Sequence, residues 1–287
     1  MKKYTIGTDV GGTKIQVGLV TPQNRLVKNE QFLIDQSSGQ AVQQSILQAI
    51  SSLYSKNVGA IGIGITGHVH TATGIVTGSV NLPKNWKNVP LKSIIQKKFK
   101  VPTAVDNDAN CIALAEAIAG KGKKYKAVLS ITLGTGIGTG LVINKQLFRG
   151  GQDSTELGHT IINEKYSFEN MVSGPLLVQN FRKKTGTIKT SFEIVAAASK
   201  GNRAAQSIIR EMSRWLAIGL NNAILSYSPD ILIIGGGLAR VSSLVRPAIK
   251  KTKMMLRYRH LRKTFITTSS LGYDAGVIGS ALLVKNQ

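Results

Sequence analysis

Short apolar runs separated by glycine-rich turns mark the beginning of the chain. Residues 4–8 and 15–20 have the composition of strands, and a third such run spans residues 26–33. The first two flank the turn Asp9-Val10-Gly11-Gly12-Thr13-Lys14. Two strands joined by a tight glycine turn predict a hairpin, whereas the glycine-rich loop of a Walker motif leads into a helix.

The segments that follow alternate between helical and strand-like patterns. Between residues 41 and 54 the apolar positions recur at helical spacing, which predicts an amphipathic helix. Residues 60–65 and 102–105 are typical of short buried strands, and residues 109–119 of a helix. This order of elements predicts an α/β domain with mixed strand directions.

A similar order of elements begins again in the second half. Residues 127–132 and 140–143 predict strands around the turn Gly134-Thr135-Gly136-Ile137-Gly138. Residues 204–227 carry one apolar stripe and predict a long helix, and residues 231–234 predict a buried strand that ends in three glycines. Two α/β halves that each open with a hairpin rich in Gly and Thr suggest a duplicated fold with a cleft between the halves.

Composition narrows the class of protein. The 287 residues suffice for two domains with full hydrophobic cores, and the one cysteine, Cys111, excludes an intrachain disulfide. No run of 18 apolar residues predicts a membrane span, and the residues before the first strand are too few for a signal peptide. We therefore expect a cytoplasmic protein without a membrane partner.

The charge balance is strongly basic. The chain has 37 Lys and Arg against 14 Asp and Glu, a net charge of +23, which attracts polyanions. The basic residues between positions 250 and 263 are interrupted by no acidic residue, yet they match no nucleic-acid-binding motif. A solvated helix face is the favoured interpretation, so nucleic acid is not expected as a partner.

The three glycine turns share the chemistry of phosphate-binding loops. Glycine lets the backbone approach a ligand closely, so that successive N–H groups point at phosphate oxygens. Thr13 and Thr135 add hydroxyl donors, and Lys14 adds a positive charge. Asp9, at the end of the first strand, is suited to hold a hydrated Mg²⁺.

The segment Val105-Asp106-Asn107-Asp108-Ala109-Asn110 leaves a buried strand and opens a helix. Asp108 has two interpretations there. It could be an ordinary helix N-cap, or a general base that takes the proton from a sugar hydroxyl as this hydroxyl attacks phosphorus. The nearby carboxylate of Asp106 could raise one of the two pKa values by repulsion.

Six motifs occur in one order along the chain: Asp9-Val10-Gly11-Gly12-Thr13-Lys14, Asn81-Leu82-Pro83, Asn107-Asp108-Ala109-Asn110, Leu133-Gly134-Thr135-Gly136-Ile137-Gly138, Glu156-Leu157-Gly158-His159 and Ile234-Gly235-Gly236-Gly237. Together they resemble the family of repressors, open reading frames and kinases (ROK), which includes bacterial glucokinases. The resemblance covers essentially the whole chain. It implies a two-domain, actin-like (ribonuclease H-like) fold with the active site in the interdomain cleft.

The resemblance also implies roles for single residues. Asp108 would be the catalytic base, and the sugar would be held by Gly67, Asn81, Asn107, Asp108, Glu156, His159 and Glu169. ATP, with Mg²⁺ held at Asp9, would bind at Asp9, Gly11, Gly12, Thr13, Lys14, Gly134, Thr135, Gly136, Gly235, Gly236 and Gly237. The resemblance further implies a homodimer, a small domain of residues 1–112 plus 275–287, and a large domain of residues 113–274.

One segment departs from the family pattern. ROK proteins commonly carry a cysteine-rich zinc loop shortly after the Glu-x-Gly-His motif. Here the residues from Thr160 to Phe168 include no cysteine, and four tetrahedral ligands cannot be assembled around Cys111 alone. We therefore expect no zinc site. The changed loop affects the inference about which sugar is bound more than the inference of phosphoryl transfer.

These observations predict an ATP-dependent hexose kinase that transfers the γ-phosphoryl group to a sugar hydroxyl, with glucose as the first choice. The alternatives are an N-acetylmannosamine kinase or another hexose kinase, polyphosphate as the donor, and a non-catalytic sugar-sensing regulator. Repressors of this family carry a helix-turn-helix segment before the first strand, whereas here that strand begins near Tyr4. The enzyme is therefore favoured over the regulator.

Overall fold

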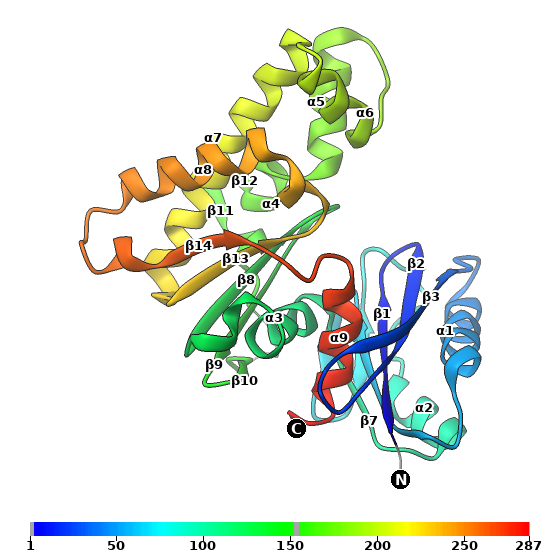
Figure 1. Ribbon diagram of the computed structural model, residues 1–287. Helices are drawn as coiled ribbons and strands as arrows, with labels where there is room; N and C mark the ends of the chain where they lie inside the picture. The colour runs from blue at the N-terminus through cyan, green and yellow to red at the C-terminus, as the bar shows by residue number, and fades with distance from the viewer. Residues whose placement is uncertain (1–2, 152–154, 287) are drawn as a thin grey trace. The chain divides into compact units, whose positions relative to one another are not determined.

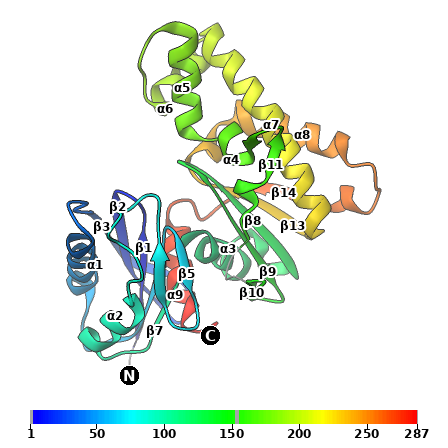
Figure 2. The same cartoon turned by 180° about the vertical axis from the view of Figure 1, so that it is seen from behind.

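The computed structural model describes residues 3–151 and 155–286 of the chain. The chain divides into two compact units (Figures 1 and 2). Unit 1 comprises Met1–Lys126, Gly140–Thr155 and Ser270–Gln287, and unit 2 comprises Ala127–Thr139 and Glu156–Ser269. Among the helices of the described residues, none has the length and apolar character needed to cross a membrane.

Unit 1 is built on a five-stranded sheet of order β3-β2-β1-β4-β7. The β1–β2 and β2–β3 pairs are antiparallel, and β1, β4 and β7 run parallel, which confirms the predicted hairpin and the mixed strand directions. Its elements are β1 Tyr4–Val10, β2 Lys14–Val20, β3 Leu26–Leu33, α1 Gly39–Leu53, β4 Val58–Ile65, β5 His68–His70, β6 Ile75–Gly78, α2 Leu91–Phe99, β7 Thr103–Asn107, α3 Asp108–Ile118, η1 Lys121–Lys124, β10 Gln146–Phe148 and α9 Asp274–Leu283.

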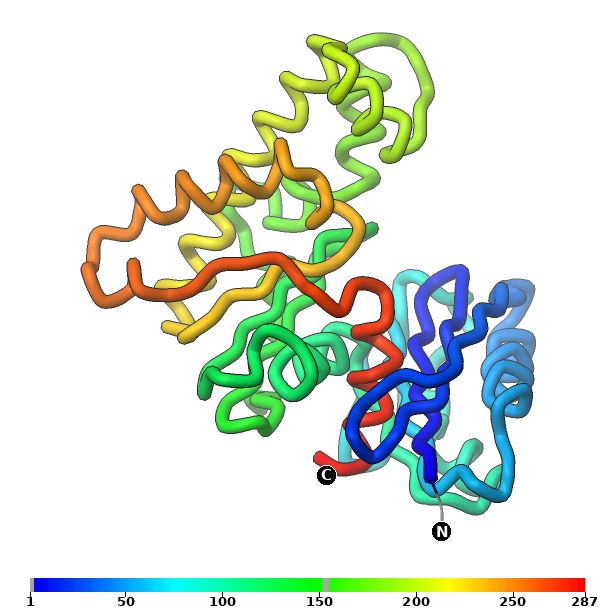
Figure 3. Tube along the Cα trace, viewed as in Figure 1, coloured from blue at the N-terminus to red at the C-terminus, as the bar shows by residue number. Residues whose placement is uncertain are grey.

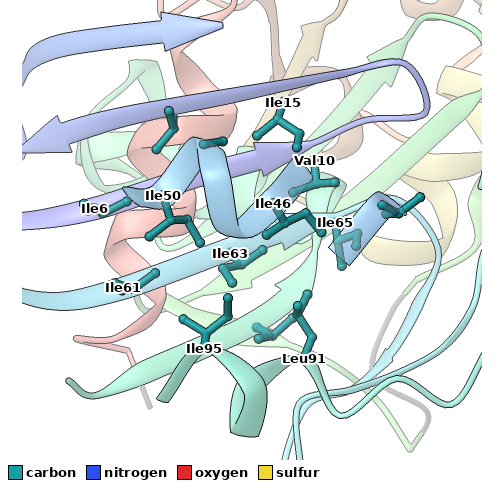
Figure 4. Packing of buried hydrophobic residues seen from close by; sticks show 14 of the residues in the cluster. Ile6, Val10, Ile15, Ile46, Ile50, Ile61, Ile63, Ile65, Leu91 and Ile95 are labelled. Carbon is teal, nitrogen blue, oxygen red and sulfur yellow. The ribbon is translucent and has the colours of Figure 1, made fainter. Parts of the chain in front are cut away.

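The two faces of this sheet are covered by helices distant in the sequence. Helix α1 packs on one face, and the C-terminal α9 lies beside the N-terminal strands on the other (Figures 1 and 3). Branched apolar side chains from β1, β2, β4, α1 and α2 interdigitate in the core, as Figure 4 shows for Ile6, Val10, Ile15, Ile46, Ile50, Ile61, Ile63, Ile65, Leu91 and Ile95. The alternating strands and the apolar stripe of α1 therefore bury one common set of side chains.

Helix α9 approaches the sheet closely because β4 carries glycine where they meet. A Cβ atom at Gly62 would overlap the carbonyl oxygen of Ser280. On its other side α9 packs against α3, and its residues are buried all along its length. A helix buried on all sides is apolar on all sides, so its sequence lacks the stripe that predicts a helix.

Unit 2 holds most of a second five-stranded sheet, whose strand order is β10-β9-β8-β13-β14. Strand β13 runs parallel to both β8 and β14. The long helix α7 packs against α8, α5 and α6. The elements are β8 Ala127–Leu133, β9 Ile137–Ile143 (which contains the boundary between the units), η2 Leu157–His159, β11 Ile161–Asn163, β12 Tyr166–Ser167, α4 Phe168–Met171, α5 Gly174–Thr185, α6 Ser191–Ser199, α7 Arg203–Tyr227, β13 Ile231–Gly235, η3 Gly237–Arg240, α8 Ser242–Met255, η4 Leu261–Lys263 and β14 Phe265–Thr268.

The units differ in their bounds from the domains expected from the sequence. A boundary after residue 112 would cut α3, whereas the structure keeps the whole helix in unit 1 because α3 packs on α9 and β4. Residues 140–155 also belong to unit 1. There the Lys145 ammonium donates to the carbonyl oxygens of Ala117 (2.8 Å), in the last turn of α3, and of Lys123 (2.7 Å), in η1.

Candidate functional site

In unit 1 the predicted catalytic residues lie where three parallel strands end. Val10 of β1 is paired with Ile65 of β4, and Ile65 is paired with Asn107 of β7. The residues directly after these strands therefore gather at one edge of the sheet. In open α/β sheets, ligands bind outside the carboxyl ends of the strands.

Asn107 and Asp108 form the junction between β7 and α3. The Asn107 side chain is the helix N-cap: its Oδ1 accepts from the N–H groups of Ala109 (2.9 Å) and Asn110 (3.4 Å). Asp108 is the first residue of the helix. The interpretation of Asp108 as the N-cap is therefore wrong, because Asn107 occupies that position; Asp108 Oδ1 also accepts from the Ala109 N–H (2.8 Å).

The other side chains expected near the sugar in unit 1 lie beside this junction. Asn107 Nδ2 donates to the carbonyl oxygen of Gly67 (2.9 Å), and Asn81 Nδ2 donates to Oγ1 of Thr66 (3.1 Å). Gly67 has a φ of +109°, and a Cβ there would collide with Ser79, so glycine is required at this position. The structure thus brings Gly67 and Asn107 together, with Asn81 held to the residue that precedes Gly67.

Asp9 belongs to the same edge and is electrostatically coupled to Asp108. Burial, together with the negative charge of Asp108, raises the pKa of Asp9 from 3.8 to about 7. The sequence suggested repulsion between Asp106 and Asp108; the structure adds Asp9, from another strand, as a carboxylate that Asp108 repels. Two carboxylates that repel each other favour a cation beside them.

In the first glycine turn, the Gly11 N–H donates to the carbonyl oxygen of Lys14 (3.0 Å), which closes the hairpin. Among the described residues, the N–H groups of Gly12 and Thr13 meet no acceptor. Thr13 and Lys14 are exposed. Adjacent free N–H groups and a nearby ammonium are the donors that a phosphate oxygen accepts from.

Unit 2 repeats this arrangement at the ends of β8 and β13. These neighbouring parallel strands pair Thr132 with Gly235, so the turn at residues 134–136 and the turn at residues 235–237 lie at one edge. Within the part of the chain that the structure describes, the N–H groups of Thr135, Gly136, Gly236 and Gly237 have no acceptor. Two turns of unit 2 thus have N–H groups with no acceptor among the described residues, and their binding of phosphate stays a prediction.

Glu169 packs against the first of these turns. Its Oε2 accepts from the Ile137 N–H (2.8 Å), and a Cβ at Gly136 would collide with its carboxylate. The residue lies in α4, whose first turn is closed by a capping box between Ser167 and Asn170. Glu169, which was predicted to bind the sugar, is thus hydrogen-bonded to the turn that was predicted to bind phosphate.

Glu156 precedes the short helix η2, and His159 is its last residue. His159 Nε2 lies 3.8 Å from Glu156 Oε2, and both side chains are exposed. The turn is held against β9, since the Leu157 N–H donates to Oγ1 of Thr139 (3.4 Å). Both polar heads remain accessible to a ligand, as hexose recognition requires.

A cavity near the third glycine turn was not predicted from the sequence. It has a volume of about 530 Å³, and its walls come from α6, α7 and the residues that link η3 to α8. The turn at Gly235–Gly237 leads through η3 directly to Arg240, Val241 and Ser242 in this wall. The residues of the three helices are far apart in the chain and form no motif, so only the fold reveals the cavity.

The described residues contain no group of three or more His, Cys, Asp or Glu side chains that could hold a metal ion. Cys111 is buried within α3 of unit 1, whereas Glu156 and His159 belong to unit 2. Mg²⁺ commonly binds with few protein carboxylates and otherwise with water and phosphate oxygens.

The motif series, the strand topology and the glycine turns are shared with known proteins. The model of the ROK family matches residues 5–287. The chain belongs to the ROK family. A ROK glucokinase from Streptomyces griseus, solved with glucose and AMPPNP, has a TM-score of 0.87 at 28% identity, and the match covers 99% of this chain and 100% of the other. The ROK chain therefore has the expected two-domain, actin-like α/β fold.

Two curated relatives match over nearly their whole length. A glucokinase from Streptomyces coelicolor is 29% identical, with 98% of this chain and 97% of the relative covered. A β-glucoside kinase from Listeria innocua is 30% identical, with 95% of this chain and 94% of the relative covered. The ROK chain is thus similar throughout to two kinases that are named for different acceptors.

Proposed function

We propose that this ROK protein is an ATP-dependent hexose kinase that transfers the γ-phosphoryl group to a hydroxyl of glucose. The observation that carries the proposal is Asp108, a carboxylate at the end of β7 that is coupled to the carboxylate of Asp9 and adjacent to Asn107. A full-length similarity to a glucokinase solved with glucose and AMPPNP supports both substrates.

Asp108 acts as the general base. It accepts the proton of the sugar hydroxyl as the oxygen attacks the γ-phosphorus. Because α3 begins at Asp108 and Asn107 caps that helix, the carboxylate is held on a rigid element. Asn107, Asn81 and Gly67 of unit 1 and Glu156, His159 and Glu169 of unit 2 supply the polar groups that hold the sugar hydroxyls.

The glycine turns bind the phosphates of ATP. Gly12 and Thr13 in unit 1, and Thr135, Gly136, Gly236 and Gly237 in unit 2, contribute N–H groups that have no acceptor among the described residues. The adenine and ribose enter the cavity of α6, α7 and α8, which begins where the turn at residues 235–237 ends. Its volume is within the usual range of sites for small molecules, about 300–1,000 Å³.

Asp9 would hold Mg²⁺ through water. Its carboxylate accepts no hydrogen bond from the described residues, and the charge of Asp108 destabilises its ionised form, so a nearby cation fits this position. When bound, the ion neutralises charge on the phosphates of ATP.

The first test is ADP release with Mg·ATP and a panel of glucose, mannose, N-acetylmannosamine, N-acetylglucosamine and a β-glucoside. We expect one strongly preferred acceptor, with glucose first. Preference for the β-glucoside or for N-acetylmannosamine would support the kinase activity and replace glucose as the proposed acceptor. No turnover with any sugar, with either ATP or polyphosphate as donor, would contradict the proposal and favour a sugar-sensing regulator.

Asp108→Asn tests the mechanism. We expect kcat to fall by about 10²–10⁴-fold, because the variant has lost the proton acceptor. Its ATP affinity and its urea midpoint should remain those of the parent chain. Asp35→Asn, an exposed change in the same unit, serves as the control and should keep normal kcat.

We further propose that the protein is a cytoplasmic homodimer and that it binds no nucleic acid. The expected homodimer rests on the family resemblance. Light scattering on the eluted protein measures the mass of the assembly against 30.7 kDa for one chain. Titration with a labelled oligonucleotide at several salt concentrations tests whether the net charge of +23 leads to binding of nucleic acid.

A further inference from the structure

A buried ion pair lies two residues before the proposed base. Arg149 follows strand β10, and its Nη2 is 2.6 Å from Oδ2 of Asp106, the penultimate residue of β7. The Asp106 side chain is 1% exposed and that of Arg149 is 26% exposed. Both residues belong to unit 1, so the pair connects two segments of one compact body.

The second oxygen of Asp106 organises the junction between β7 and α3. Asp106 Oδ1 accepts from the Asn107 N–H (2.7 Å) and from Nδ2 of Asn110 (2.9 Å). Asn107 in turn caps α3 and donates to the carbonyl oxygen of Gly67. One carboxylate thus receives donors from the residue before Asp108, from the first turn of its helix and from Arg149.

Arg149 supplies the positive charge that this buried carboxylate needs. Burial raises the pKa of Asp106, while the charge of Arg149 and the hydrogen bonds from Asn110, Arg149 and Asn107 lower it. Cys111 of α3 is a further titratable group near Asp106, and its own pKa is raised by burial and by Asp106. Without Arg149 the carboxylate would be a buried charge held only by neutral donors, which is costly.

We propose that Arg149 is a positioning residue for phosphoryl transfer, acting through Asp106 to hold the Asn107–Asp108 junction in its reactive geometry. This role rests on the proposed kinase function, because it assigns the base to Asp108. Arg149 needs no contact with the substrate. It acts on the orientation of the base, and a displacement of about 1 Å at a reacting group can cost about 10²-fold in rate.

The test compares the turnover of four variants with that of the parent chain. Arg149→Met should lower kcat by about 10–100-fold, while the KM for ATP changes by less than about twofold, because the turns and the cavity of unit 2 are untouched. Arg149→Lys should recover most of the kcat, since only one nitrogen of Arg149 contacts Asp106 and an ammonium can replace it. Arg25→Met, an exposed change in unit 1, is the matched control and should leave kcat unchanged.

The double variant Asp106→Asn with Arg149→Met separates positioning from simple charge neutralisation. It removes both charges, so its urea midpoint should return towards that of the parent chain even if Arg149→Met alone is unstable. We expect its kcat to stay at the level of Arg149→Met, because the link between the two segments is still missing. A kcat restored along with the midpoint would overturn the positioning role.

The outcomes also distinguish this inference from the proposed function. A parent chain that phosphorylates a sugar, together with an Arg149→Met variant as active as Arg25→Met, would overturn the role of Arg149 alone. A parent chain with no turnover on any sugar would overturn the kinase itself and the role of Arg149 with it. Loss of kcat in Arg149→Met with rescue by lysine would support both.

Discussion

Glu169 accepts a 2.8 Å hydrogen bond from the Ile137 N–H and thereby holds the glycine turn of residues 134–138. Glu169 was expected to bind sugar, and the turn was expected to bind phosphate. A single carboxylate in contact with both sets of ligands would couple the position of the acceptor to that of the donor. This relationship gives the first prediction.

Glu169→Ala should raise the KM for sugar and the KM for ATP together. Loss of the acceptor leaves the N–H of the buried Ile137 unpaired, which costs about 1–3 kcal/mol in the stability of the turn and loosens the groups expected to bind phosphate. Glu169→Gln keeps an oxygen acceptor and should retain the ATP affinity better than the alanine variant. Steady-state kinetics with each substrate varied measure both effects.

The control for this prediction is Glu164→Gln, an exposed change in the turn between β11 and β12. It should alter neither KM. If Glu169→Ala changed the sugar KM alone, the hydrogen bond to Ile137 would have no part in binding ATP.

Asp9 should make the metal-free protein less stable as the pH rises. Its pKa is about 7 in the folded chain and about 3.8 when unfolded, so the folded state holds a proton that the unfolded state has lost between these values. The stability contributed by this proton is present below about pH 4 and is lost as the pH rises through about 7. Asp9→Asn removes this contribution and should be less sensitive to pH than the parent chain.

Urea midpoints at pH 5 and pH 8, with EDTA and without nucleotide, measure this effect. Asp35→Asn is the control, because hydrogen bonds from Ser37 lower the pKa of Asp35 and its contribution has the opposite sign. An Asp9→Asn variant that lost as much stability between pH 5 and pH 8 as the parent would contradict the raised pKa. The same variant should also need more Mg²⁺ for turnover.

Gly236→Ala should destabilise unit 2. Gly236 has a φ of +84°, and an added Cβ would overlap the backbone of Leu133, so we expect a loss of about 1–3 kcal/mol in the free energy of unfolding. Gly237→Ala is a matched control, since an added Cβ there meets no atom within 4 Å. Equal urea midpoints for the two variants would show that the turn can relax around a side chain.

Ser199→Trp should distinguish a nucleotide donor from polyphosphate. Ser199 is exposed on α6 and lines the cavity beside the third glycine turn, so an indole there would occupy the space proposed for adenine. We expect the KM for ATP to rise at least about tenfold, equivalent to about 1.4 kcal/mol. Turnover with polyphosphate, which has no base, should not change if the chain uses that donor.

The control is Ala196→Trp, which places the same side chain at an exposed position of the same helix outside the cavity lining. It should keep the ATP affinity of the parent chain. The same increase in both variants would place the nucleoside elsewhere in the protein.

Several elements of the fold were predictable because their signals are local. The turn at residues 11–13 had the composition of a hairpin, and β1 and β2 form one. The apolar stripe of residues 204–227 predicted α7, which spans Arg203–Tyr227. Helix α9 and the strands β5, β6, β11 and β12 were not predicted, because a helix buried on all sides has no stripe and strands of two to four residues are too short to show alternation.

In the candidate site, too, some features were predictable from the sequence and others were not. The sequence by itself determined which groups are candidates for the chemistry, because a glycine turn and a carboxylate directly after a strand are properties of a few consecutive residues. Only the tertiary structure decided which of these groups act on one another. Asp9 is coupled to Asp108, Arg149 is paired with Asp106, and Glu169 holds Ile137. Each interaction joins residues far apart in the chain, and its strength depends on distance and burial, which no local pattern contains.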